Sequence, residues 1–182
     1  EPIPDPQPET KPYDPSLYLR NYFYVDSGLT YLGDLATIIG GLEHLEGREV
    51  SIMADGIVQP KQTVLNGQIT LTTPASIVHV GLGYISVLQT MRPEQPDAEG
   101  TSQGRQKRIN QVVFKLLKTK HFKFASENKV ETLKAIIFDD LFSGNKEVNF
   151  PTGINRHGHI TIVNDLPTPI TVLAIIPELG VS

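Results

Sequence analysis

The chain has 182 residues, which is enough for one ordinary domain or for two small domains that share an interface. Hydrophobic residues make up 39% and charged residues 20%, so the chain can bury a core. Its formal net charge of −4 includes no block of like charges that would form a dedicated nucleic-acid surface, and the absence of cysteine excludes disulfides, thiolate metal sites and cysteine nucleophiles.

Residues 1–20 are predicted to form a proline-rich linker or arm. Six prolines stand among the first 15 residues, at positions 2, 4, 6, 8, 12 and 15. Because proline fixes φ and lacks a backbone N–H, this stretch cannot join the interior of a sheet and should run extended. Two interpretations stay open, a disordered tail and an arm laid on a neighbouring subunit.

Residues 21–91 are predicted to form a small β-barrel-like or sandwich module, because short strand patterns alternate with turn residues. The first strand is residues 22–25, which are aromatic and β-branched, and residues 26–28 (DSG) should end it. Residues 42–46 form at most one helical turn.

Two hairpin turns are predicted inside this module, at Asp55-Gly56 and at Asn66-Gly67. These pairs tolerate the positive φ angles of two-residue turns, and alternating segments flank them at residues 48–54, 57–65 and 68–72. We therefore expect a three-stranded meander, with Pro60 at an edge or at a bulge of its middle strand.

The module is expected to close with two more strands. Pro74 should restart the chain, and residues 76–80 and 84–88 have strand patterns. Gly81 and Gly83 lie between these strands, and we interpret them as a bulge or bend, because a dinucleotide-binding loop would need a third glycine followed by a helix.

Residues 92–104 are predicted to be a loop, and residues 105–182 a second β-rich module. Residues 105–119 combine a helical stripe with a β-prone centre, and we interpret them as a short helical turn followed by a strand. Further strands are expected at residues 131–138, 146–150, 158–163 and 170–176. The last of these is apolar on both faces, so we expect it to be central and covered on both sides.

The histidines supply the candidates for a metal site. His157 and His159 have the spacing of two metal ligands on a strand, and Asp165 or Asp139 could approach as a third. No third ligand belongs to the motif itself, so paired surface histidines are the favoured interpretation. His79 lies in the middle of a strand, where we expect it to be hydrogen-bonded or to face solvent.

No residue pattern predicts an active site. Asp139 and Asp140 are adjacent, and adjacent side chains of a strand point to opposite faces, so we interpret them as turn residues rather than as an acid/base pair. The chain also lacks the Gly-x-Ser-x-Gly pattern of a nucleophile elbow and any phosphate loop. We therefore expect a protein that is not an enzyme and that has no catalytic, cofactor-binding or metal-binding residues.

One basic stretch could contact nucleic acid if it lined a channel. It consists of Arg105, Lys107, Arg108, Lys115, Lys118 and Lys120. Because Glu94, Asp97 and Glu99 precede it and temper the local positive field, we favour an interface or a solvated segment. No apolar run approaches the roughly 20 residues that a membrane span needs, so we expect no membrane insertion.

Several segments are distinctive in combination, namely residues 24–31 (YVDSGLTY), 41–47 (GLEHLEG), 54–56 (ADG), 67–71 (GQITL), 75–82 (ASIVHVGL), 100–109 (GTSQGRQKRI) and 169–178 (PITVLAIIPE). This ordered series resembles the nozzle or tail tubular protein B family of short-tailed bacteriophages. The resemblance covers residues 22–178, and its specificity comes from the order of the pieces. Residues 120–124 (KHFKF) depart from the longer, more polar turn of that family.

The resemblance implies a structural role in the tail of the virion. It implies a homo-hexameric ring that contacts other tail proteins, such as the adaptor and fibres, and through which genomic DNA passes during ejection. It brings no catalytic residues. Because the chain is shorter than a whole nozzle protein, we expect it to be the C-terminal part of one or a related smaller component. The alternative is a receptor- or glycan-binding module of a tail fibre or baseplate, although the chain has no tryptophan for sugar stacking.

Overall fold

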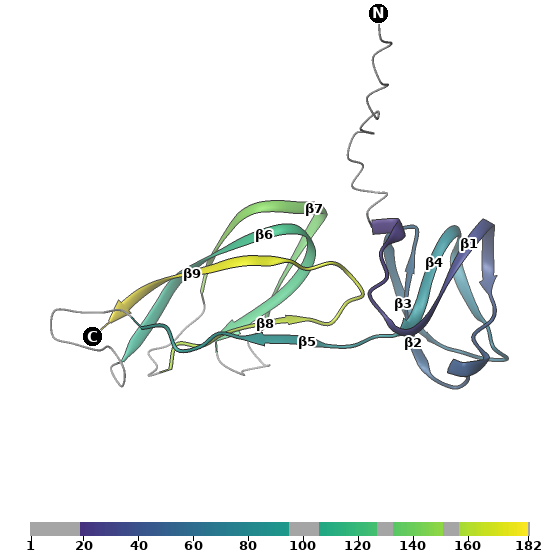
Figure 1. Cartoon of the computed structure of the whole chain (residues 1–182), viewed down its shortest axis with the longest axis horizontal. Coiled ribbons are helices and arrows are strands. Elements are labelled where there is room, and N and C mark those ends of the chain that lie inside the picture. The colour runs from purple at the N-terminus through teal and green to yellow at the C-terminus, as the bar shows by residue number, and fades with distance from the viewer. Residues whose placement is uncertain (1–18, 95–105, 127–132, 151–156, 182) are drawn as a thin grey trace, which may run out of the picture.

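The computed structural model describes residues 19–94, 106–126, 133–150 and 157–181. The fold is mainly β, as predicted, and its strands form two antiparallel sheets that lie side by side along the long axis of the molecule (Figure 1). Neither sheet closes into a barrel among the described strands. Residues 1–18 of the predicted arm (residues 1–20) and most of the predicted loop at residues 92–104 lie outside the described residues.

The first sheet has the strand order β1-β4-β2-β3. Its strands are β1 Asp26–Ile39, β2 Glu49–Ala54, β3 Ile57–Thr63 and β4 Ile69–Leu82. A 3-10 helix, η1 at Glu43–Leu45, joins β1 to β2 and confirms the predicted single turn. Residues 19–21 form a helical turn ahead of the sheet.

The two predicted hairpin turns are confirmed. Asp55 and Gly56 have φ angles of 46° and 82°, and Asn66 and Gly67 have 53° and 68°, as a turn with two left-handed residues requires. The Glu46 carboxylate accepts hydrogen bonds from the backbone N–H groups of Asn66 (2.9 Å) and Gly67 (2.6 Å). The second turn is therefore held by a side chain from 20 residues earlier in the chain.

The predicted meander is wrong in its strand order. After the second turn, the chain forms only the Leu65–Gln68 bridge with the end of the preceding strand. The following strand, β4, is long enough to pass this bridge and to insert between β1 and β2, where Val80 pairs with Ile52. Turn residues specify a reversal of the chain, but the pairing of a long strand depends on which neighbours bury its side chains.

Two further strand limits differ from the prediction. Pro74 does not interrupt the chain, because β4 runs through it, and Pro74 is exposed. The predicted strand at residues 22–25 is wrong, because none of these residues is in a strand and β1 begins at Asp26, where the strand was expected to end. A register shift after Asp26 accommodates Ser27, whose φ is 47°, so the turn-like sequence forms a bulge in β1 instead of a stop.

Pro60 lies on the edge strand β3, at a register shift, as predicted. Val50 pairs with Gln62 and Ile52 with Gln59, so that two residues of β3 face one residue of β2. The bulge includes Pro60, and a residue without an N–H is tolerated there because no ladder bond needs it.

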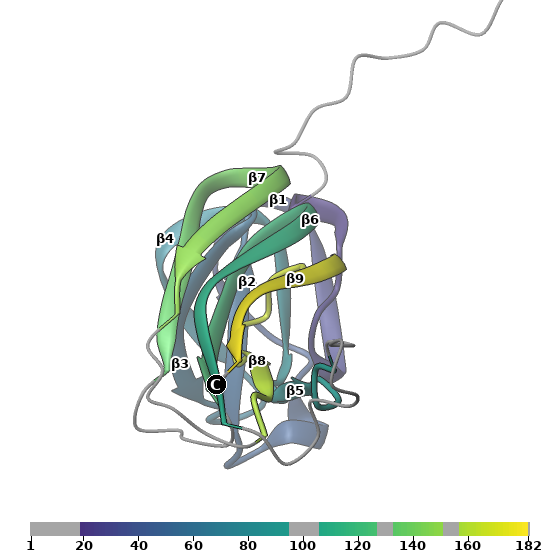
Figure 2. The same cartoon turned by 90° about the vertical axis from the view of Figure 1, so that its left-hand side faces the viewer.

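The second sheet has the order β5-β8-β6-β7, with β9 also paired to β6. Its strands are β5 Ser86–Gln89, β6 Lys107–Ser126, β7 Lys134–Asn149, β8 Ile160–Asn164 and β9 Val172–Val181. One half of β6 pairs with β9 and the other half with β8, so the sheet curls (Figure 2). The boundary between the sheets falls before β5, whereas the sequence placed residues 84–88 in the first module. The alternation in β5 predicted a strand without revealing that β8 is its partner.

Other expectations for the second half are corrected. From Lys107 onward the predicted helical turn is strand, because the β-branched centre of β6 pairs on both sides. Residues 134–138 and 146–149 of the weak candidates at residues 131–138 and 146–150 belong to one strand, β7. β9 is an edge strand and is not covered on both sides, since it pairs only with β6 and leaves Leu173 and Ile176 each 54% exposed.

Each sheet buries a core of its own. Ile39, Leu42, Val50, Ile52, Val64, Val78 and Val80 are fully buried in the first core. The second core is aromatic, with the ring of Phe114 at 5.1 Å from that of Phe122 and 5.5 Å from that of Phe124. The two clusters share no residue, so each sheet carries its own hydrophobic stabilisation.

Candidate functional site

The candidate metal ligands do not converge. His157 and His159 stack, with ring centroids 5.9 Å apart, and Nδ1 of His159 lies 2.8 Å from the carbonyl oxygen of Thr90, so this nitrogen donates a hydrogen bond. Asp165 forms an ion pair with Lys123. Within the described ranges, no group of three or more histidine, aspartate or glutamate side chains could hold a metal ion.

Asp139 lies at an irregular part of β7 instead of a turn between strands. His121 pairs with Ile137 and Thr119 with Phe142, so five steps along β7 oppose two steps along β6. Asp139 and Asp140 lie in this bulge, and both side chains are exposed. The turn prediction for these aspartates is wrong, because sequence alternation does not indicate where a long strand bulges.

His79 is hydrogen-bonded, which confirms one of its two predicted environments. It is 3% exposed, its Nδ1 lies 2.9 Å from the Thr30 hydroxyl, and its Nε2 lies 2.8 Å from the carbonyl oxygen of Arg20. The Phe23 ring packs edge-on against the imidazole at 5.7 Å. His79 therefore ties the segment before β1 to the sheet.

Asp55 is a second polar anchor of this segment, and the sequence indicated only its turn. Its carboxylate accepts hydrogen bonds from Arg20 (3.1 Å), from the hydroxyl (3.0 Å) and N–H (3.1 Å) of Ser76, and from the N–H of Ile77 (3.1 Å). Burial would raise the pKa of Asp55, but these hydrogen bonds and the Arg20 charge outweigh it and lower the pKa.

The described residues of the basic stretch lie along β6. Arg108 and Lys115 are exposed on β6, while Nζ of Lys120 donates to the backbone oxygen of Asp139. Lys118 has a φ of 47°, at a register shift of β6. Arg105 lies outside the described residues.

Gly81 and Gly83 are explained by close packing. A Cβ atom on Gly81 would lie 2.7 Å from the backbone oxygen of Asp26, and one on Gly83 would lie 2.4 Å from Oγ of Ser51. Both distances are too short for a side chain. Gly81 lies within β4, beside the bulge of β1, so the predicted bulge is real but belongs to the neighbouring strand.

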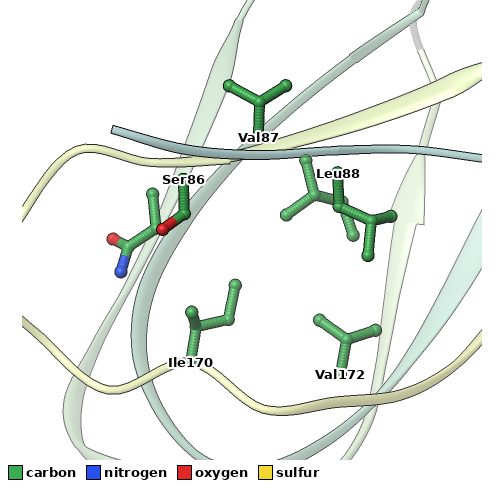
Figure 3. Close-up of a pocket in the computed structure, with 7 residues that line it drawn as sticks. Ser86, Val87, Leu88, Ile170 and Val172 are labelled. Atoms are coloured by element: carbon green, nitrogen blue, oxygen red, sulfur yellow. The ribbon is translucent and has the colours of Figure 1, made fainter. Parts of the chain in front are cut away.

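Two adjoining hollows lie beside β5. One, of about 240 Å³, is lined by Ser86, Val87, Leu88, Ile162, Asn164, Ile170 and Val172. Leu88 points into it, toward Val172, while Val87 points the opposite way (Figure 3). The second, of about 230 Å³, is lined by Tyr24, Tyr84, Ser86, Asn164, Leu166, Thr168 and Ile170. We name the second one the tyrosine hollow.

Large apolar side chains are exposed on strands at the sheet edges. On β1, Leu32 is 76% and Leu35 71% exposed, and near β5, Ile85 is 69% and Val87 61% exposed. Both strands have a strand partner on one side only among the described elements. An apolar edge with free N–H and C=O groups favours pairing with another chain.

No protein-family model and no curated protein matches this chain. The part of the chain that the structure describes contains no helix with the length and apolar character that crossing a bilayer requires.

Proposed function

We propose that this chain is a structural subunit of a bacteriophage tail, part of a homo-hexameric nozzle or tail-tube ring through which DNA is ejected. The observation that carries the proposal is the exposed apolar edge strand that each sheet presents, at β1 and at β5. In a ring, each copy must present surfaces that become buried in the contacts with its neighbours.

The two edges suit association for a physical reason. β1 has 14 residues, and most of them are exposed, including Leu32 and Leu35. A monomeric protein usually protects such an edge with charges, prolines or a covering loop. β5 likewise exposes all four of its residues. Burial of these side chains in contacts between copies would stabilise an assembly by about 25 cal/mol for each Å² removed from water.

The residues that carry the family resemblance have structural roles in this fold. Glu46 of the GLEHLEG segment caps the Asn66-Gly67 turn, and Gly56 of the ADG segment occupies a left-handed position against Leu19. A motif of turn residues and close contacts supports a role as a scaffold. The net charge of −4 also suits a conduit, because a strongly basic lumen would retain DNA.

Electron microscopy and mass measurement of the purified full chain test this proposal. We expect closed rings of six copies. The double variant Leu32→Lys/Leu35→Lys and the single variant Val87→Lys should each shift the protein toward monomers, with a dissociation constant raised at least tenfold. Thr72→Lys is the control, because it adds a charge at an exposed position of the interior strand β4.

The competing function, a receptor- or glycan-binding module, predicts a different outcome. In that case the full chain would stay monomeric at high concentration, and it would bind host-cell surface glycans with an affinity that Val87→Lys leaves unchanged. That result would contradict the ring proposal.

A further inference from the structure

The tyrosine hollow lies where three connecting segments meet. Tyr24 precedes β1, Tyr84 joins β4 to β5, and Thr168 and Ile170 belong to the connection between β8 and β9. This connection extends toward the first sheet (Figure 1). The side chains that line the hollow are uncharged, and two of them are aromatic.

Thr168, one of the residues that line the hollow, has a buried hydroxyl without a hydrogen-bond partner among the described residues. Thr168 is 4% exposed, and its Oγ1 has no partner among the described residues. The backbone of Thr168 is satisfied, since its oxygen accepts from Nδ2 of Asn164 (2.9 Å) and its N–H donates to Leu166 (2.7 Å). A buried donor left unpaired costs free energy, so this hydroxyl suits a ligand that brings an acceptor.

Tyrosine rings combined with hydroxyl donors suit a proline-rich peptide. An extended polyproline segment offers carbonyl acceptors and few N–H donors, and its pyrrolidine rings pack against aromatic faces. Tyr84 and Ser86 add two hydroxyl groups to that of Thr168, and Tyr24 adds a second aromatic ring. The chain itself contains such a peptide, because six of its first 15 residues are prolines.

We propose that the tyrosine hollow binds the chain's own N-terminal segment, residues 1–15, as an extended polyproline strand. The segment can reach it. Only four residues lie between Leu19 and Tyr24, so the five steps along the chain place their Cα atoms at most about 18 Å apart. Fifteen residues in the polyproline conformation span about 45 Å.

The attachment point of the segment is fixed, which favours binding within one chain. Leu19 is 6% exposed, and Arg20 bonds to both Asp55 (3.1 Å) and Ser76 (2.8 Å). A short tether holds its peptide at an effective concentration in the millimolar range, so even weak contacts fill the hollow. This contact does not require assembly and is independent of the proposed ring.

Distances between two spin labels, measured on the full chain by pulsed electron–electron double resonance, test the inference. Because the chain has no cysteine, the substitutions Gln7→Cys and Gln89→Cys place two spin labels uniquely, one on the segment and one on β5 near the hollow. A bound segment gives a narrow distance distribution. Dilution with a tenfold excess of unlabelled chain should leave that distribution unchanged.

Two threonine variants form a matched pair. Thr168→Val removes the unpartnered hydroxyl in the hollow and should lower the ratio of bound to free segment roughly fivefold, the loss expected for one net hydrogen bond. Thr161→Val is the control, because Thr161 is also buried with an unpartnered hydroxyl but lies outside the lining of the hollow. The distance distribution between the spin labels in Thr161→Val should match that of the parent chain.

Three results would overturn the inference. One is a broad distance distribution in the parent chain. Another is a narrow distribution that disappears on dilution, which would assign the hollow to a neighbouring copy. The third is an equal response to Thr168→Val and Thr161→Val. Unfolding midpoints measured for both variants show whether each one remains folded.

Discussion

At the scale of single residues, polar side chains anchor the segment before β1 to the first sheet. Asp55 and His79 both reach this segment through Arg20, one through its guanidinium and the other through its carbonyl oxygen. The Asp55 side chain is partly exposed and His79 is buried, so little water competes for their hydrogen bonds. Replacement of Asp55 or His79 leaves the donors and acceptors that bonded to it without a hydrogen-bond partner.

Asp55→Asn should lower the free energy of unfolding at pH 7 by about 1–3 kcal/mol. Because the pKa of Asp55 is lowered by folding, its contribution is fully present above the ordinary aspartate pKa and is lost as the pH falls through the folded value. The difference between parent and variant should therefore shrink from about pH 5 toward pH 3. Urea denaturation across this range measures it.

Asp34→Asn is the control for this measurement, because Asp34 is exposed on β1. It should change the free energy of unfolding by less than about 0.5 kcal/mol. A pH-independent difference between the parent and Asp55→Asn would contradict the role given to the Asp55 carboxylate.

Gly56→Ala should destabilise the protein by about 1–2 kcal/mol. The φ of Gly56 is 82°, and an added Cβ would lie 3.0 Å from Cβ of Leu19, so the change strains the turn and crowds the anchored segment. Gly40→Ala is the matched change, because its Cβ would meet only Gln68 at 3.6 Å. Thermal unfolding compares the two, and equal midpoints would contradict this account.

At the scale of elements, β6 organises the second sheet. It has 20 residues and pairs with β7 along one edge and with β9 and β8 along the other. Side chains on its two faces differ in burial, since Phe114 is fully buried and Val113 on the opposite face is not. The register shift at Lys118 separates its two halves.

Phe114→Ala should cost about 3–5 kcal/mol of unfolding free energy, because it removes the ring at the centre of the aromatic cluster and leaves a cavity. Val113→Ala, one position away, should cost less than about 1.5 kcal/mol because its side chain is only partly buried. Denaturant titration gives both values. Equal losses of unfolding free energy in the two variants would contradict the difference in burial between the two faces of β6.

At the scale of the whole molecule, the two sheets have separate cores and are joined through residues 83–85. The first core contains residues up to Leu82, and the second begins at Ile109. Strand pairing occurs within each sheet, and β5 carries the chain into the second one. Separate cores make each sheet a potential unit of cooperative unfolding.

Calorimetry of the full chain should resolve two unfolding transitions. Ile52→Ala should lower the midpoint of one transition by several degrees, and Phe114→Ala should lower that of the other, since each residue is fully buried in a different core. A single transition that both variants shift equally would show that the sheets unfold together.

The amino-acid sequence by itself determined the mainly β fold, both left-handed turns and the bulge at Pro60, because the φ angles and hydrogen-bonding groups of these residues act locally. Only the tertiary structure decided which strands pair. The long strand β4 passes its hairpin neighbour β3, β6 pairs with β8 and β9 as well as with β7, β5 joins the second sheet, and β9 becomes an edge. Pairing depends on distant side chains that share a core. The Asp55 anchor and the tyrosine hollow could not be predicted from the sequence for the same reason, because their residues come from separated parts of the chain.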